Sequence, residues 1–204
     1  PGKGVGWQNM TFDDAQAEKL LKNVFLVSLL LFLTSFFFKD RYPQPYDILR
    51  QLYNEPKQTE TNKEVFHVKM KGEDYKIVPR FEYELYGMVV SYHNSSEWWD
   101  YYHELAKDYL NFKDIGIIWG DAVKSDVYNY MTFKSESWTL WRTPKRGYYS
   151  NGVELKGENC SNNHVLSIDP KVTAEIKSAQ RGDQVFMKGY LVDYTNNEKF
   201  GYRK

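Results

Sequence analysis

One uncharged stretch constrains this chain more than any other feature. From Val24 to Phe38 the sequence VFLVSLLLFLTSFFF holds no charged residue and only three polar ones, all of them hydroxyls. As a helix this stretch measures about 22 Å at ~1.5 Å per residue, which is short of the ~30 Å hydrocarbon core of a bilayer. Leu20 and Leu21 lengthen the apolar span. Lys22, which follows them, is compatible with this longer span because its amine can extend toward the headgroups. The sequence therefore predicts one N-terminal transmembrane helix, with the lipid bilayer contacting residues 20–38.

Two other interpretations of this stretch are weaker. A helix in a protein core rarely carries a run of phenylalanines at one end without a polar face. A cleavable signal peptide needs small residues at a cleavage site after the apolar run, and residues 35–40 offer none. Basic residues flank the stretch on both sides, so the positive-inside rule does not decide the orientation. A short tail before the anchor and a large domain after it favour a single-pass signal-anchor with the C-terminal domain in the periplasm.

The rest of the chain divides into a stalk and a domain. Residues 39–63 are polar, contain three prolines and end in a segment with the composition of a linker. From residue 64 apolar and polar residues alternate, which is typical of strands. We therefore expect a tail and anchor helix over 1–38, a polar stalk over 39–63 and a folded domain over 64–204.

The domain begins with a predicted hairpin, in which strands around Phe66–Met70 and Tyr75–Ile77 flank a Lys-Gly-Glu-Asp turn. The elements expected after it are a long strand over 81–90 bent at Gly87, a helix over 97–110, a buried strand over 115–120 that places Trp119 in the core, strands over 131–133 and 138–142, a helix opened by Asp169 and Pro170, a strand over 184–194 and the start of another from 198. This order predicts a mainly β (α+β) fold, an OB-like small β-barrel with an inserted helix, preceded by the transmembrane helix. A plain small barrel and an α+β sandwich are the alternatives.

Four segments of the domain stand out together: Tyr83–Ser91, Asp114–Gly120, Ser161–His164 and Gly182–Val192. With them the chain resembles a family of uncharacterised bacterial membrane-anchored proteins over roughly residues 75–195. The resemblance implies a bacterial source. It implies no activity, because the family has no defined activity and no catalytic residues to carry over.

The charges of the chain balance, with 27 Lys plus Arg against 27 Asp plus Glu. Nucleic-acid binding draws its affinity mostly from Lys and Arg at phosphates, so a balanced chain with a membrane anchor argues against a nucleic-acid partner. The single cysteine excludes an internal disulfide and a multi-cysteine metal site.

Residues able to carry chemistry are scattered. The four histidines include no pair at the i, i+4 spacing of a helical zinc site. Cys160 and His164 would have to converge in space with an orienting group to act as nucleophile and base. Carboxylates between Glu97 and Asp108 follow one expected helix and are typical of a solvated face. We expect no catalytic residue, no cofactor and no metal, and rank an enzyme of unknown type third among the possible functions.

Aromatic residues make up 17% of the chain, which is high. Some aromatic side chains are expected to lie off the apolar face of the helix over 97–110, and others in the long loop over 143–168. Exposed aromatic residues, and an arginine beside them, are typical of surfaces that contact a partner. A protein–protein surface, a glycan platform and packing under the loop are the open interpretations. We predict a partner-binding site made of Trp99, Tyr101, Arg146, Tyr148 and Tyr149.

Together these features predict a non-catalytic, membrane-anchored scaffolding or interaction subunit whose partners are other subunits of a larger membrane protein complex. The alternative is a periplasmic module that binds cell-wall glycan or lipid between the barrel and the long loop.

Overall fold

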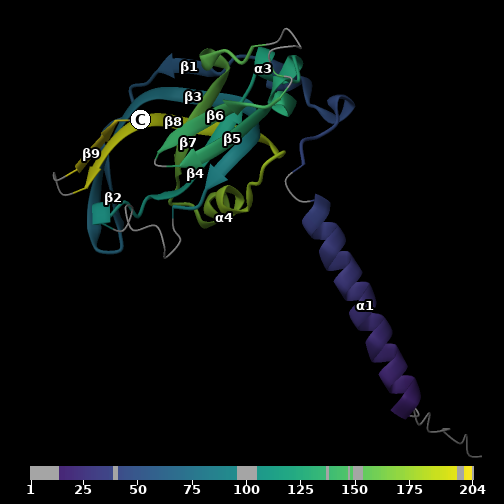
Figure 1. The fold of residues 1–204 in the computed structure, drawn as a ribbon. Helices are drawn as coiled ribbons and strands as arrows, with labels where there is room; N and C mark the ends of the chain where they lie inside the picture. Colours follow the sequence, from purple (N-terminus) through teal and green to yellow (C-terminus); the bar gives the residue numbers. More distant parts are fainter. Residues whose placement is uncertain are drawn as a thin grey trace, which may run out of the picture. The chain divides into compact units, whose positions relative to one another are not determined.

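A computed structural model describes residues 14–38, 41–95, 105–136, 138–146, 148, 154–196 and 200–203. The chain forms two compact units, Pro1–Lys39 and Asp40–Lys204 (Figure 1). Each unit is considered by itself below.

The first unit is built on the helix α1, Asp14–Phe38. Its large apolar side chains from Leu20 to Leu33 expose between 41% and 70% of their surface. They lie on all sides of the helix, so α1 has no polar stripe of the kind that a surface helix normally shows. No helix in the described part of the chain is long and apolar enough to cross a membrane.

The second unit is dominated by an antiparallel sheet whose strand order is β7-β4-β3-β8-β9, with β1 and β2 also paired to β3. Its strands are β1 Lys57–Glu60, β2 Phe66–Met70, β3 Glu73–His93, β4 Asn111–Ile118, β7 Cys160–Leu166, β8 Gln184–Asn196 and β9 Phe200–Arg203 (Figure 1). A separate hairpin consists of β5 Met131–Glu136 and β6 Thr139–Pro144. The expected mainly β fold with some helices is confirmed.

The long strand β3 organises the sheet, because β1, β2, β4 and β8 all pair with it. Two register shifts, at Pro79/Phe81 and Val89/Ser91, interrupt its ladders, and such bulges bend a strand and increase its twist. The bend was expected at Gly87, but the pairing of β3 with β8 is regular there. A Cβ at Gly87 would collide with the side chain of Ile117, so this glycine permits close packing of β3 against β4.

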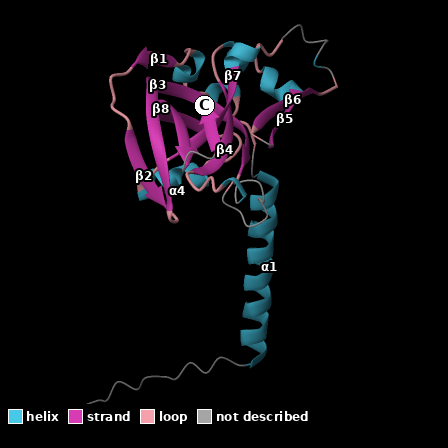
Figure 2. Cartoon of the chain, turned by 90° about the vertical axis from the view of Figure 1, so that its left-hand side faces the viewer, coloured by secondary structure: helices cyan, strands magenta, loops and turns pink. Residues whose placement is uncertain are grey.

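The two faces of the sheet are covered differently (Figure 2). One face packs under the β5–β6 hairpin, the short helix α3 (Asp121–Lys124) and 3₁₀ turns, in a core that includes Met88, Val90 and Ile118. The other face meets the helix α4, Pro170–Ser178, whose Ile176 packs on Leu85 and Ile117 among others. As predicted, Asp169 caps α4, since its carboxylate accepts hydrogen bonds from the amides of Lys171 and Val172.

The expectation of a barrel is wrong, because the sheets do not close. In the described residues the sheet path ends at β7 on one side and at β9 on the other. The chain passes from β7 to β8 through α4, and in the described residues β7 pairs with β4 while β8 pairs with β3 and β9, so β7 and β8 do not pair with each other. The edges of β7 and β8 that a barrel would pair therefore stay apart.

The expected stalk is in fact part of the folded unit from Asp40 onward. Leu52, in the 3₁₀ turn Arg50–Tyr53, is completely buried. β1 pairs with β3, and the Glu55 carboxylate accepts a hydrogen bond from the indole of Trp119 at 2.8 Å. The prolines and polar residues of the expected stalk form turns and one edge strand, although their composition is that of a linker. The helix expected over 97–110 lies mostly outside the described residues.

Candidate functional site

The five residues predicted to bind a partner do not form one described surface. Trp99, Tyr101 and Tyr149 lie outside the described residues. Arg146 is exposed. Tyr148 is only 7% exposed and belongs to the core under the hairpin, where its hydroxyl accepts a hydrogen bond from the amide of Leu155 at 2.9 Å. Tyr148 therefore packs inside the domain, contrary to the expectation of an outward side chain.

Cys160 and His164 do not converge. They are four residues apart on one strand, β7, which separates their Cα atoms by about 13 Å at ~3.3 Å per residue. Burial raises the pKa of the Cys160 thiol, although the nearby Arg142 guanidinium, 3.2 Å from the sulfur, opposes the shift. A thiol held protonated is a poor nucleophile, so this pair is not arranged for covalent catalysis.

His164 instead belongs to a buried polar cluster that joins β7 to β4. Its Nδ1 lies 2.5 Å from Oδ1 of Asp114, and Nδ2 of Asn111 donates to the same oxygen at 2.8 Å. The side chains of His164 and Asp114 are 10% and 1% exposed. In the described part of the chain no group of three or more His, Cys, Asp or Glu side chains is placed to hold a metal ion.

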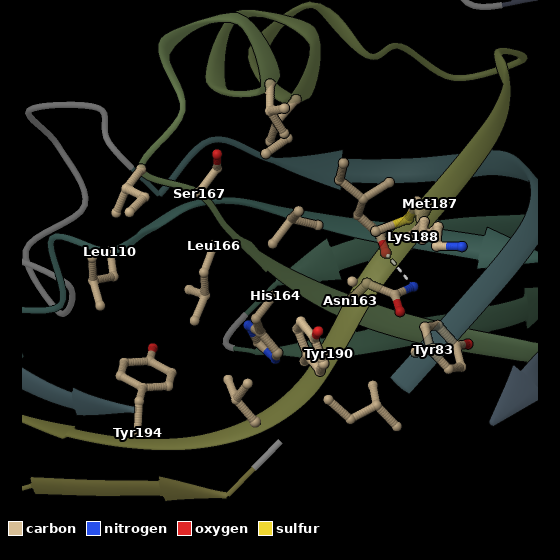
Figure 3. A pocket seen from close by; sticks show the side chains of 18 of the residues that line it. Tyr83, Leu110, Asn163, His164, Leu166, Ser167, Met187, Lys188, Tyr190 and Tyr194 are labelled. Carbon is tan, nitrogen blue, oxygen red and sulfur yellow. Dashed lines mark hydrogen bonds between the residues drawn. The ribbon is translucent and has the colours of Figure 1, made fainter. Parts of the chain in front are cut away.

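A groove of about 1110 Å³ lies on the face of the sheet that carries α4 (Figure 3). Apolar side chains from five strands and from α4 line it, among them Val68, Ile115, Leu166, Ile176 and Met187. Aliphatic side chains dominate this lining, which is typical of sites for apolar ligands or apolar protein segments.

Two uninterrupted runs of residues line the groove, 161–168 and 185–192. Successive side chains of a strand point to opposite faces, so a cavity that touches every residue of a strand borders the edge of that strand. The first run includes most of β7, and the second lies within β8. The groove is therefore the gap between two strand edges that a closed barrel would have joined. We call it the β7–β8 groove.

Few charged groups reach this groove. Within the described lining they are Glu175 on α4 and Lys188 on β8. The Lys188 ammonium donates to the Glu84 carboxylate at 2.6 Å; this bond raises the pKa of Lys188 and lowers that of Glu84. Tyr83 adds a phenol whose pKa is raised by burial, so it remains a neutral hydrogen-bonding group. The groove offers an apolar, nearly neutral surface.

Lys113 holds one wall of the groove in place. It is 2% exposed, and its ammonium donates to the carbonyls of Lys177 and Ala179 at the end of α4, at 2.9 and 2.5 Å. It also lies 4.2 Å from the centroid of the Tyr92 ring. A cation at a helix C-terminus satisfies carbonyls that have no partner within the helix, so Lys113 fixes α4 to β4.

The sequence indicated half of this groove. The alternation of Val185, Met187 and Leu191 with exposed residues predicted β8 and its apolar face. The strand β7 was missed, because Ser161, two asparagines and His164 have low strand propensity and were assigned to a long loop. No family model, curated protein or solved structure matches this chain.

Proposed function

We propose that the protein is a non-catalytic, membrane-anchored interaction subunit of a larger membrane complex, and that the β7–β8 groove is its docking site. The observation that carries the proposal is the groove itself, about 1110 Å³ of mainly apolar surface between two strand edges. Contiguous apolar surface of this kind on a folded domain typically marks a binding site.

Two groups of the described lining that could carry chemistry already have partners. The Lys188 ammonium is engaged by Glu84, and the His164 imidazole is engaged by Asp114. The pair of His164 and Asp114 lies buried, with Asn111 as its further partner. These features support binding as the role of the groove.

Membrane attachment is proposed through residues 20–38, with the domain on the periplasmic side. The support is the apolar surface of α1, since a helix that is apolar on every side is stable only where lipid or protein covers it. Extraction of membranes with alkaline carbonate tests attachment, and protection of the domain from externally added protease tests its side. Full release by carbonate would contradict the anchor.

The docking role is tested by filling the groove. A Cβ added at Gly189 has open space within 4 Å, so Gly189→Trp introduces bulk toward the groove with little strain. Tyr130→Trp is the control, because Tyr130 is 39% exposed in the 3₁₀ turn Val127–Tyr130 and is not among the residues that line the groove. After solubilisation in mild detergent, Gly189→Trp should shift the protein from a large assembly to a smaller species, whereas Tyr130→Trp should not. A native protein that elutes as a monomer would contradict the proposal.

A second candidate is the binding of a lipid in the same groove, which its aliphatic lining favours over a glycan. Native mass spectrometry of the detergent-extracted protein tests this. A stoichiometric lipid that disappears in Gly189→Trp and persists in Tyr130→Trp would favour the second candidate.

A further inference from the structure

We propose that the occupant of the β7–β8 groove is an extended, uncharged peptide segment of a partner protein, which pairs with the edge of β8 as an added strand. This inference rests on the proposed docking function of the groove. It adds the kind of partner and the conformation in which the partner binds.

The edge of β8 is partly used already. β9 pairs antiparallel with β8 from Asp193 to Asn196, on the side away from β3. From Gln184 to Val192 no described strand continues that ladder, although β3 pairs with β8 along this whole length on the other side. About 30 Å of regular strand edge, at ~3.3 Å per residue, therefore extends the site that β9 occupies.

An added strand matches what this edge offers. Edge strands present a row of backbone N–H and C=O groups that bind another extended chain, and such strand addition is an established mode of peptide recognition. An acyl chain would cover the apolar lining but leave these backbone groups without partners. The position of the edge inside the groove therefore favours a peptide.

The side chains indicate the chemistry of that peptide. Along β8, Val185 and Met187 face the apolar side with Gly189, where open space receives a side chain. The ammonium of Lys188 is engaged by Glu84, which leaves Glu175 as the other charge in the described lining. A nearly neutral groove complements a segment with apolar residues at alternate positions and no charge among them.

A photo-crosslinking residue tests the occupant directly in the full chain in its native membrane. Gly189→benzoylphenylalanine places the probe on the groove side of β8, and Tyr130→benzoylphenylalanine, at an exposed residue outside the groove lining, is the control. We expect position 189 to form adducts within one short segment of one partner protein, with yields at least several-fold above those at position 130. Hydrogen exchange of the same detergent-extracted assembly should show slowing of about tenfold or more at alternate amides of 184–192, relative to the dissociated protein.

The outcomes separate this inference from the function on which it rests. Adducts to phospholipid acyl chains at position 189 would overturn the peptide occupant but leave the groove as a binding site. An intact assembly with no adduct at 189 and unchanged exchange over 184–192 would overturn strand addition but leave the interaction subunit. If mild detergent always extracts the protein as a monomer and never in an assembly, both the interaction subunit and strand addition would be overturned.

Discussion

Replacement of Trp119 tests how far the sheet depends on its central contacts. The indole is 6% exposed, packs in the cluster with Leu85 and Ile117, and donates to Glu55 at 2.8 Å. Truncation of a buried Trp to Ala costs about 3–5 kcal/mol. For a unit of this size, roughly 2–4 °C per kcal/mol applies, so Trp119→Ala should lower Tm by roughly 6–20 °C.

A second substitution separates packing from hydrogen bonding. Trp119→Phe keeps most of the buried apolar surface and removes the indole donor, while Glu55 retains the amide of Asn159 at 3.1 Å. A hydrogen bond to a charged group contributes about 1.5–3 kcal/mol, so the loss in Trp119→Phe should be smaller than in Trp119→Ala. Trp141, which is 57% exposed on β6, supplies the control. Trp141→Ala should change stability by less than ~0.5 kcal/mol.

The assay is urea unfolding of the fragment 40–204, a compact unit, followed by circular dichroism because the substitutions alter fluorescence. The slope with denaturant should stay constant while the midpoint falls. If Trp119→Ala lost no more than Trp141→Ala, β4 would not be central to the core. If Trp119→Phe and Trp119→Ala lost equal amounts, the stabilisation would come from the hydrogen bond alone and the packing argument would fail.

Three further results are expected from the same fragment. Lys113→Met removes the donor that fixes the end of α4 and should lower the free energy of unfolding by about 1.5–3 kcal/mol. Amide exchange in the variant should speed up more in α4 than in β3. An equal increase in both elements would contradict the tethering role. Tyr148→Ser should lower Tm by several degrees because it empties a core position, and Tyr148→Phe should lower it less; an unchanged Tm would restore Tyr148 to the surface. Burial raises the pKa of Tyr75 to about 12 from an ordinary value near 10, so the stability it contributes is complete below pH ~10 and is lost as pH rises toward 12. Absorbance at 295 nm and unfolding followed against pH should show this loss diminished in Tyr75→Phe.

Local patterns predicted the parts of the fold that local interactions determine. The β2–β3 hairpin follows from alternation on both sides of Lys71 and Gly72, which adopt the positive φ values of 47° and 84° that a tight two-residue turn requires. The start of α4 follows from Asp169 and Pro170. Each of these elements has its cause within a few residues of itself.

Other parts depend on tertiary contacts that no local pattern records. All seven residues of β7 are half-buried, so the strand has no alternation, and pairing with β4 compensates for its weak propensity. The segment after Asp40 looked like a linker because it offers few apolar residues, yet one of them, Leu52, fits completely into the core. Whether β7 and β8 close a barrel depends on the path of the connection between them, which spacing alone does not determine.

The open groove lies beside that connection. α4 packs Ile176 and Ala179 against the strands and so covers part of the apolar face between β7 and β8. Lys113 holds the end of α4 there, and Gly189 adds no side chain to the space that remains. A closed pairing of β7 with β8 would bury this face and satisfy both strand edges at once. The described structure instead leaves the edge of β8 from Gln184 to Val192 open beside apolar side chains and a glycine. An open edge of this kind is a template for pairing with another chain, which is the basis of the proposed docking site.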